Sequence, residues 1–207
     1  MPHNIKETNT LELFELFESL SKYIEENIRM YALGGTDLTI FGIKPSTRDI
    51  DINIPKHKEY FYLCKIFEQI GFKKMGTIRW LTQEGLAFDL FTGSNFLGTQ
   101  LLPDCLEKAK FVKAFGKIEL YTICLEDIII SKLARGDPRD FMDIKSILDT
   151  EKINLNYLVG RYRETMENST VAFYKRKLLD LIEIKFSQWK FKLDQKLIDE
   201  VKKWEEH

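Results

Sequence analysis

Two stretches in the N-terminal part of the chain carry apolar residues at the spacing of an amphipathic helix. The first runs over residues 13–28, and Thr8 or Thr10 is available as its N-terminal cap. The second runs over residues 60–70 and ends at Gly71. The polar positions of the first stretch are rich in glutamate, which is typical of a solvated helix face.

Short apolar runs between and after these stretches predict β-strands instead. The strands are expected over residues 30–33, 49–54, 78–82 and 86–91, with a hairpin formed by residues 111–115 and 117–121. From residue 122 onward the apolar spacing becomes helical again, over residues 125–134, 141–148, 157–166, 171–189 and 193–204. We therefore predict an α+β fold, with an α/β core over residues 1–121 and a helical C-terminal region, residues 122–207, packed on it.

Composition restricts the classes of function more than it identifies one. The chain has 207 residues, is 44% hydrophobic and 30% charged, and has a formal net charge of −1, so no overall basic excess indicates nucleic-acid binding. Its cysteines (Cys64, Cys105 and Cys124) are odd in number and lack C-x-x-C spacing, which argues against a disulfide framework. We find neither a signal-peptide pattern nor an apolar run of about 20 residues, and we expect a cytoplasmic protein without membrane association.

The candidate chemistry begins with two carboxylates in an apolar strand, Asp49 and Asp51. Successive side chains of a strand point to opposite faces, so the two aspartates share a face while Ile50 and Ile52 point into the core. Their Cβ atoms should lie within roughly 7 Å of each other. Carboxylates this close repel unless a positive group lies between them, and a divalent cation such as Mg²⁺ or Mn²⁺ meets that need. The alternative is that both lie at the exposed end of an edge strand.

Gly34 and Gly35 follow the apolar run 30–33, and Thr36-Asp37 can cap a helix that begins immediately afterwards. Glycine lets a ligand approach the backbone closely, and the N–H groups at a helix N-terminus favour an anion such as phosphate. A glycine pair alone is usually only a turn. Its short distance in sequence from the aspartate pair is what supports a role in phosphate binding.

These residues carry a family resemblance. Leu33-Gly34-Gly35, a gap of thirteen residues, and then Asp49-Ile50-Asp51-Ile52 resemble the signature of the DNA polymerase β-type nucleotidyltransferase superfamily. The longer run over residues 46–51 is similar to that of the small prokaryotic nucleotidyltransferases, both an uncharacterised group and the nucleotidyltransferase toxins of toxin–antitoxin systems. The resemblance implies a nucleotidyltransferase-type mixed β-sheet flanked by helices.

The resemblance also implies roles for particular residues. Asp49 and Asp51 would bind metal, and a third metal-binding carboxylate would follow on a neighbouring strand, where Asp89 interrupts the apolar run 86–91. Glu84 and Glu119 are the alternatives for this third carboxylate. The nucleotide-binding roles would pass to a set of small residues that surround the aspartate pair in sequence: Gly34, Gly35, Thr36, Ser46 and Thr47.

A second candidate segment lies in the helical region, where Lys132 ends one helix and Asp140 and Asp143 open the next after a Gly136-Asp137-Pro138 turn. It resembles a lysine helix followed by an acidic helix in toxin-like nucleotidyltransferases. As a hypothesis, Lys132 reaches the triphosphate and Asp140 holds Lys132 or Arg139 in place. The alternative is structural, since acidic first turns and basic last turns are what the helix dipole favours.

The resemblance implies a metal-dependent enzyme that transfers a nucleoside monophosphate from an NTP such as ATP to an acceptor hydroxyl and releases pyrophosphate. Two Mg²⁺ ions would lie between the three aspartates and the triphosphate, and Asp89 would accept the hydroxyl proton. Three kinds of acceptor remain open: RNA, with tRNA as the example that the toxins suggest, a protein hydroxyl, and a small molecule of the aminoglycoside type. As a toxin-like enzyme it would have an antitoxin partner. A different class of answer is a non-catalytic nucleotide- or RNA-binding module that keeps the fold, or a regulatory partner in a toxin–antitoxin pair.

Overall fold

The computed structural model describes residues 7–205, and the chain divides into two compact units. The first unit contains the residues up to Phe96 together with Pro103–Cys124. The second contains Leu97–Leu102 together with the chain from Leu125 onward. We predicted a single boundary near residue 122. The division differs from this prediction in that Leu97–Leu102 also belong to the second unit.

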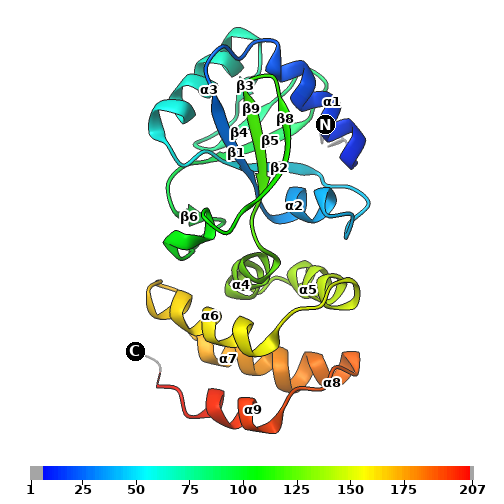
Figure 1. Ribbon diagram of the computed structural model, residues 1–207, viewed down its shortest axis with the longest axis vertical. Coiled ribbons are helices and arrows are strands. Elements are labelled where there is room, and N and C mark those ends of the chain that lie inside the picture. The colour runs from blue at the N-terminus through cyan, green and yellow to red at the C-terminus, as the bar shows by residue number, and fades with distance from the viewer. Residues whose placement is uncertain (1–6, 206–207) are drawn as a thin grey trace. The chain divides into compact units, whose positions relative to one another are not determined.

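Within residues 7–205, seven strands form one mixed sheet in the order β3-β4-β5-β2-β1-β9-β8 (Figure 1). Strands β1 and β9 are parallel, as are β2 and β5, while the other neighbouring pairs are antiparallel. The α+β class and the mixed sheet are therefore confirmed. The strands are β1 (Ile28–Ala32), β2 (Asp49–Asn53), β3 (Lys73–Lys74), β4 (Arg79–Leu81), β5 (Ala87–Phe91), β8 (Lys110–Phe115) and β9 (Ile118–Thr122), and the short β6 (Asn95–Phe96) and β7 (Thr99–Gln100) lie outside this sheet.

The helices of the first unit are α1 (Thr10–Ser21), α2 (Gly34–Ile40) and α3 (His57–Gln69), with a 3₁₀ turn at Pro103–Cys105. The cap of α1 is Asn9, whose side chain accepts from the N–H of Glu12 while the Glu12 carboxylate accepts from the N–H of Asn9. The prediction of Thr8 or Thr10 as the cap was therefore wrong. The predicted extension to residue 28 was also wrong, because Ile28 opens β1 and its apolar side chain suits either the helical or the strand period.

One face of the sheet carries the core of the first unit. Leu13 and Phe17 of α1 and Leu63 and Phe67 of α3 pack in one apolar cluster with the inward side chains of the strands. The buried strand residues of this cluster are Ile28, Met30, Ala32, Ile50, Ile52, Trp80, Phe88, Leu90, Phe115, Ile118 and Leu120. Because side chains alternate along a strand, the residues between these positions share the opposite face. Asp49, Asp51, Arg79 and Asp89 are among them.

The second unit is helical, as predicted. Its elements are α4 (Leu125–Arg135), α5 (Pro138–Thr150), α6 (Leu155–Glu167), α7 (Tyr174–Leu179), a π-helix (Asp180–Lys185), α8 (Phe186–Trp189) and α9 (Gln195–Lys202). The helix predicted over residues 171–189 starts only at Tyr174, because Phe173 adopts a left-handed conformation with φ of 56°. No helix in the described part of the chain is both long and apolar enough to cross a membrane.

Candidate active site

The parallel pair β2 and β5 brings the predicted carboxylates together on one sheet face. In their register Asp51 lies opposite Asp89, and Asp49 lies opposite Ala87. Ile50 and Ile52, the alternate residues of β2, are buried in the core, so Asp49 and Asp51 share the other face as expected. Three carboxylates from two neighbouring strands therefore occupy one small area of the sheet.

Arg79 supplies the positive charge that this area requires. It lies on β4, directly opposite Asp89 in the antiparallel register of β4 and β5. Its Nε donates to Asp89 Oδ1 (2.8 Å), and its terminal Nη2 donates to Asp89 Oδ2 (2.7 Å) and to Asp49 Oδ1 (3.0 Å). The guanidinium thus forms a bidentate pair with Asp89 and bridges it to Asp49.

The pKa of Arg79 reflects the negative charges that surround its side chain. The hydrogen bond with Asp89 raises the pKa of Arg79, and the charges of Asp89, Asp49 and Asp51 add to that effect although burial opposes it. Of the two carboxylates paired with Arg79, Asp89 is the more enclosed, its side chain being 12% exposed against 37% for Asp49. Arg79 therefore stays protonated at neutral pH and places one positive charge between the carboxylates.

The two alternatives for the third carboxylate lie elsewhere. Glu84 is exposed in the turn between β4 and β5. Glu119 lies on β9, which β1 separates from β2, and its carboxylate accepts from Arg29 Nε at 3.0 Å and from the Tyr121 hydroxyl at 3.1 Å. Of the three candidates, Asp89 is the one that the structure places beside Asp51.

The glycine pair forms the start of α2 rather than a loop before it. Leu33 is the N-cap, so the prediction that Thr36-Asp37 caps the helix was wrong. Gly34 has φ of +55°, a conformation that residues with a side chain rarely adopt. Gly35 needs to be glycine for a different reason, since an added Cβ would lie 2.8 Å from the Thr47 hydroxyl oxygen.

Thr36 and Thr47 fix the backbone of β2 through their hydroxyl groups. Both hydroxyls donate to the Asp49 carbonyl oxygen, at 3.1 Å from Thr36 and 2.9 Å from Thr47. The Thr36 hydroxyl also accepts from the N–H of Asp51 at 2.8 Å. Both residues are buried, so their observed contacts position the aspartates. Ser46 is half-buried, and its hydroxyl donates to Glu7 at 2.8 Å.

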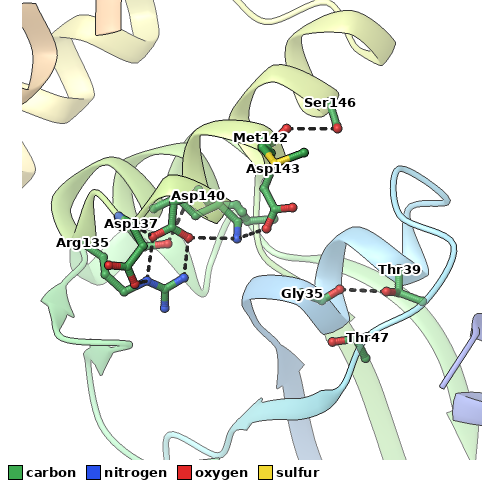
Figure 2. Close-up of polar contacts among 12 residues, drawn as sticks. Gly35, Thr39, Thr47, Arg135, Asp137, Asp140, Met142, Asp143 and Ser146 are labelled. Carbon is green, nitrogen blue, oxygen red and sulfur yellow. Dashed lines mark hydrogen bonds and ion pairs between the residues drawn. The ribbon is translucent and has the colours of Figure 1, made fainter. Parts of the chain in front are cut away.

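The second candidate segment forms a buried ionic cluster within the second unit (Figure 2). Lys132 Nζ lies 2.6 Å from Asp143 Oδ2 and 3.5 Å from Asp140 Oδ1, and its side chain is only 3% exposed. Arg135, rather than the predicted Arg139, holds Asp140 in a bidentate pair at 2.8 and 2.5 Å. A contact between Lys132 and a nucleotide stays a prediction.

The pKa of Asp140 shows how this cluster is balanced. Burial of the carboxyl group would raise that pKa, but the hydrogen bond from Arg135 and the charges of Arg135 and Lys132 outweigh burial and lower it. The N–H of Asp137 adds a further hydrogen bond to Asp140 at 3.2 Å. A similar buried pair joins Arg161 Nε to Asp127 Oδ1 at 2.6 Å.

Arg79 is the residue of the candidate site that the sequence prediction missed. The signal was present, since Arg79 interrupts the apolar run of residues 78–81 as Asp89 interrupts 86–91. What the sequence does not provide is the register of β4 against β5. That register depends on the turn that joins them, where the N–H of Thr82 donates to the Leu86 carbonyl oxygen and that of Leu86 to the Thr82 hydroxyl.

A mixed sheet that presents an aspartate pair and a third carboxylate on the face opposite its core, next to a glycine-led helix, is typical of the nucleotidyltransferase class. Residues 11–194 match the family model described as "Nucleotidyltransferase of unknown function (DUF6036)", and the chain belongs to this family. None of the curated protein sequences matches the chain.

Two solved structures are similar to this chain. The antibiotic-resistance factor ANT(2'')-Ia aligns with a TM-score of 0.54 and 13% identity, covering 78% of this chain and 96% of that protein. A candidate nucleotidyltransferase from Thermotoga maritima, TM1012, aligns with a TM-score of 0.45 and 14% identity, covering 72% of this chain and 100% of that one. At such identities, the likeness to ANT(2'')-Ia supports the fold alone.

The close approach of α2 to Thr47 leads to a first prediction. Gly35→Ala should destabilise the protein by about 1–3 kcal/mol, because the added methyl group displaces the Thr47 hydroxyl from the Asp49 carbonyl. Chemical denaturation gives the free energy of unfolding. Thr47→Ala should remove part of this cost, so the double variant Gly35→Ala/Thr47→Ala should lose less stability than the sum of the single variants.

Gly160 is the matched control for Gly35. It lies within α6, and an added Cβ there meets nothing within 4 Å. Gly160→Ala should therefore stabilise the protein by about 0.5–1 kcal/mol through the higher helix propensity of alanine. Equal free energies of unfolding for Gly35→Ala and the wild type would contradict the steric argument.

The buried ionic cluster leads to a second prediction. Lys132→Ala should lower the free energy of unfolding by about 3–5 kcal/mol, because Asp143 and Asp140 would lose a buried cationic partner. Lys145→Ala should change it by less than about 1 kcal/mol, since the pair of Lys145 with Asp149 is exposed. Similar, small losses for both variants in thermal or chemical denaturation would show that the cluster contributes little to stability.

Proposed function

We propose that this protein is a metal-dependent nucleotidyltransferase that moves a nucleoside monophosphate from an NTP to an acceptor hydroxyl. The observation that carries the proposal is the convergence of Asp49, Asp51 and Asp89 on one face of neighbouring strands. A stable fold has little reason to place three carboxylates side by side, since like charges directly opposite one another destabilise a sheet. Such an arrangement is retained where a cationic partner is needed for function.

The donor set suits a divalent cation. Carboxylate oxygens are the ligands that Mg²⁺ and Mn²⁺ prefer, and this face of the sheet already attracts a cation in the form of Arg79. Among residues 7–205 no three histidine, cysteine or acidic side chains are arranged closely enough to hold a metal as they stand. In our proposal Asp49, Asp51 and Asp89 hold the metal once Arg79 releases Asp49.

Each residue of the site has a part in the proposed transfer. The acceptor oxygen attacks the α-phosphorus, the bond from that phosphorus to the bridging oxygen breaks, and pyrophosphate leaves with that electron pair. Asp89 accepts the proton of the acceptor hydroxyl, since it is an enclosed carboxylate that Arg79 holds in position through two hydrogen bonds. Bound Mg²⁺ would supply positive charge for the triphosphate and the developing alkoxide. Gly34 and Gly35 allow the phosphates to approach the backbone.

The experiment is incubation of the purified protein with each α-labelled NTP, Mg²⁺, and either total cellular RNA or total cellular protein. Label in one macromolecular pool supports the proposal and gives the acceptor class. NTP binding without label in any pool, or after addition of small hydroxylated acceptors, would favour a non-catalytic nucleotide-binding module. A toxin-like role with an antitoxin partner stays a prediction from the family resemblance.

A third prediction concerns the aspartates themselves. Asp51→Asn and Asp49→Asn should each lower the transfer rate by about 100-fold or more while the fold is retained, because a neutral amide is a poor partner for a divalent cation. Label transfer and circular dichroism measure the two properties. Glu84→Gln is the matched control, since that carboxylate lies in the exposed turn between β4 and β5. Near wild-type turnover by both asparagine variants would refute the metal assignment.

A fourth prediction concerns Arg79 as the competing cation. Arg79→Gln should raise the affinity of the protein for Mn²⁺, measured by calorimetry without nucleotide, by at least about 10-fold. A unit charge about 4 Å from a carboxylate contributes ~4 kcal/mol at an effective dielectric constant of 20, and 10-fold corresponds to ~1.4 kcal/mol. Arg48→Gln is the control, because Arg48 pairs with Glu7 at the surface. Unchanged or weaker Mn²⁺ binding by Arg79→Gln would mean that Arg79 does not compete for the metal ligands.

A further inference from the structure

A pocket of about 440 Å³ lies within the first unit, lined by residues of α1 and of the turn between β4 and β5. Its volume falls within the range of ~300–1,000 Å³ that is usual for small-molecule sites. None of the residues with a part in the proposed transfer lines it, so it is distinct from the candidate active site. Its apolar lining consists of Leu16, Leu20, Tyr23, Ile70, Phe72 and Leu86.

The charged side chains that line this pocket are all acidic. They are Glu12 and Glu15 of α1 and Glu84 of the β4–β5 turn, and among residues 7–205 no lysine, arginine or histidine lines the pocket. Glu12 and Glu15 lie three residues apart on one helix, so they share a face with about 5–6 Å between their Cβ atoms. In the described part of the chain the Glu15 carboxylate forms no ion pair. The pocket therefore favours a cation and disfavours an anion.

Thr8 provides a second observation that is independent of the glutamates. It lines the pocket and is only 1% exposed, yet its hydroxyl oxygen has no hydrogen-bond partner within residues 7–205. A buried hydroxyl without a partner is unfavourable, and most buried polar atoms in folded proteins are hydrogen-bonded. Its position in the lining indicates that a ligand with a hydrogen-bond donor completes the site.

These observations together define the chemistry of the ligand. An ammonium group carries only donors, which suits carboxylate oxygens and a hydroxyl oxygen. A hydrated metal ion would make no use of Leu16 and Leu20, whereas a chain of methylene groups packs on apolar surface as the stem of a lysine does. Ammonium groups joined by short methylene chains can reach Glu12 and Glu15 together.

We propose that this pocket binds a linear polyamine, a molecule in which two or more ammonium groups are joined by short methylene chains. One ammonium group donates to the Thr8 hydroxyl oxygen and another to the Glu15 carboxylate, while the methylene chain lies on Leu16 and Leu20. This site is additional to the proposed nucleotidyl transfer and does not depend on it.

The pocket is connected to the candidate active site through Thr8. The N–H of Thr8 donates to the Thr47 carbonyl oxygen at 2.8 Å, and the N–H of Thr47 donates to the Thr8 carbonyl oxygen at 2.9 Å. The Thr47 hydroxyl in turn donates to the Asp49 carbonyl oxygen. A polyamine held by Thr8 therefore stabilises the segment that positions Asp49.

The first experiment is a calorimetric titration of spermidine into the purified protein at low ionic strength, without nucleotide or divalent metal. We expect saturable binding of one molecule per chain, with a dissociation constant of about 1 mM or lower. Mg²⁺ should weaken spermidine binding no more than NaCl does at equal ionic strength. Absence of saturable binding, or specific displacement by Mg²⁺, would overturn the proposal.

Glu15→Gln should weaken spermidine binding by about 5-fold, the effect of one unit charge about 4 Å from an ammonium group in water. Glu18→Gln is the matched control, because Glu18 is exposed on the same helix and does not line the pocket. It should change the affinity by less than about 2-fold, as should Asp51→Asn. Equal weakening by Glu15→Gln and Glu18→Gln, or loss of binding in Asp51→Asn, would place the ligand elsewhere.

Thr8→Val separates ligand binding from a structural role of the hydroxyl. Valine keeps the shape of threonine, and the hydroxyl that it removes has no partner within residues 7–205. The free energy of unfolding, measured by chemical denaturation, should therefore stay the same or rise, while the affinity for spermidine falls by about 5-fold. A loss of stability with unchanged affinity would assign the hydroxyl to structure and contradict the proposed contact.

Discussion

Electrostatic repulsion among three carboxylates on one sheet face is the constraint on which the rest of this site depends. Asp51 and Asp89 lie directly opposite each other on parallel strands, and Asp49 lies on the same face as Asp51. Only a positive group can make this arrangement tolerable, and Arg79 provides it from the next strand with three hydrogen bonds. The site is therefore charged with both signs before any ligand arrives, which holds its side chains in defined positions.

The backbone around the carboxylates also helps to hold them in position. The carbonyl of Asp49 and the N–H of Asp51 are bonded by threonine hydroxyls rather than by a neighbouring strand at this point. Thr36 brings α2 against β2 through these bonds, and Gly35 leaves the space that the Thr47 hydroxyl occupies. The small residues of the sequence motif thus have a structural explanation in the positioning of the aspartates, whatever further contacts they make with a nucleotide.

The sequence was sufficient to predict the class of fold and the sheet face shared by the three aspartates, because both rest on local patterns. Alternation in β2 and β5 directs Asp49, Asp51 and Asp89 away from the core, and helical spacing identified the second unit. Arg79 was missed because its role depends on which strand pairs with β5 and in which register, and neither is a local property. The end of α1 at Ser21 was missed for a related reason, since the apolar Ile24 and Ile28 continue the helical spacing although they are buried outside the helix.

The buried cluster of Lys132, Asp140, Asp143 and Arg135 shows the converse case, in which the sequence suggested a ligand-binding role and the structure shows partners within the protein. Lys132 follows an isoleucine run, which favoured a role in binding the nucleotide. Its observed partners, Asp140 and Asp143, lie in the same helical unit and neutralise its charge. A buried charge that is already paired has little left to offer a ligand, so the observed contacts of Lys132 favour a role in stability. At 13% identity the likeness to ANT(2'')-Ia likewise describes the fold and not the substrates, because a ligand is selected by individual side chains and not by the arrangement of the backbone.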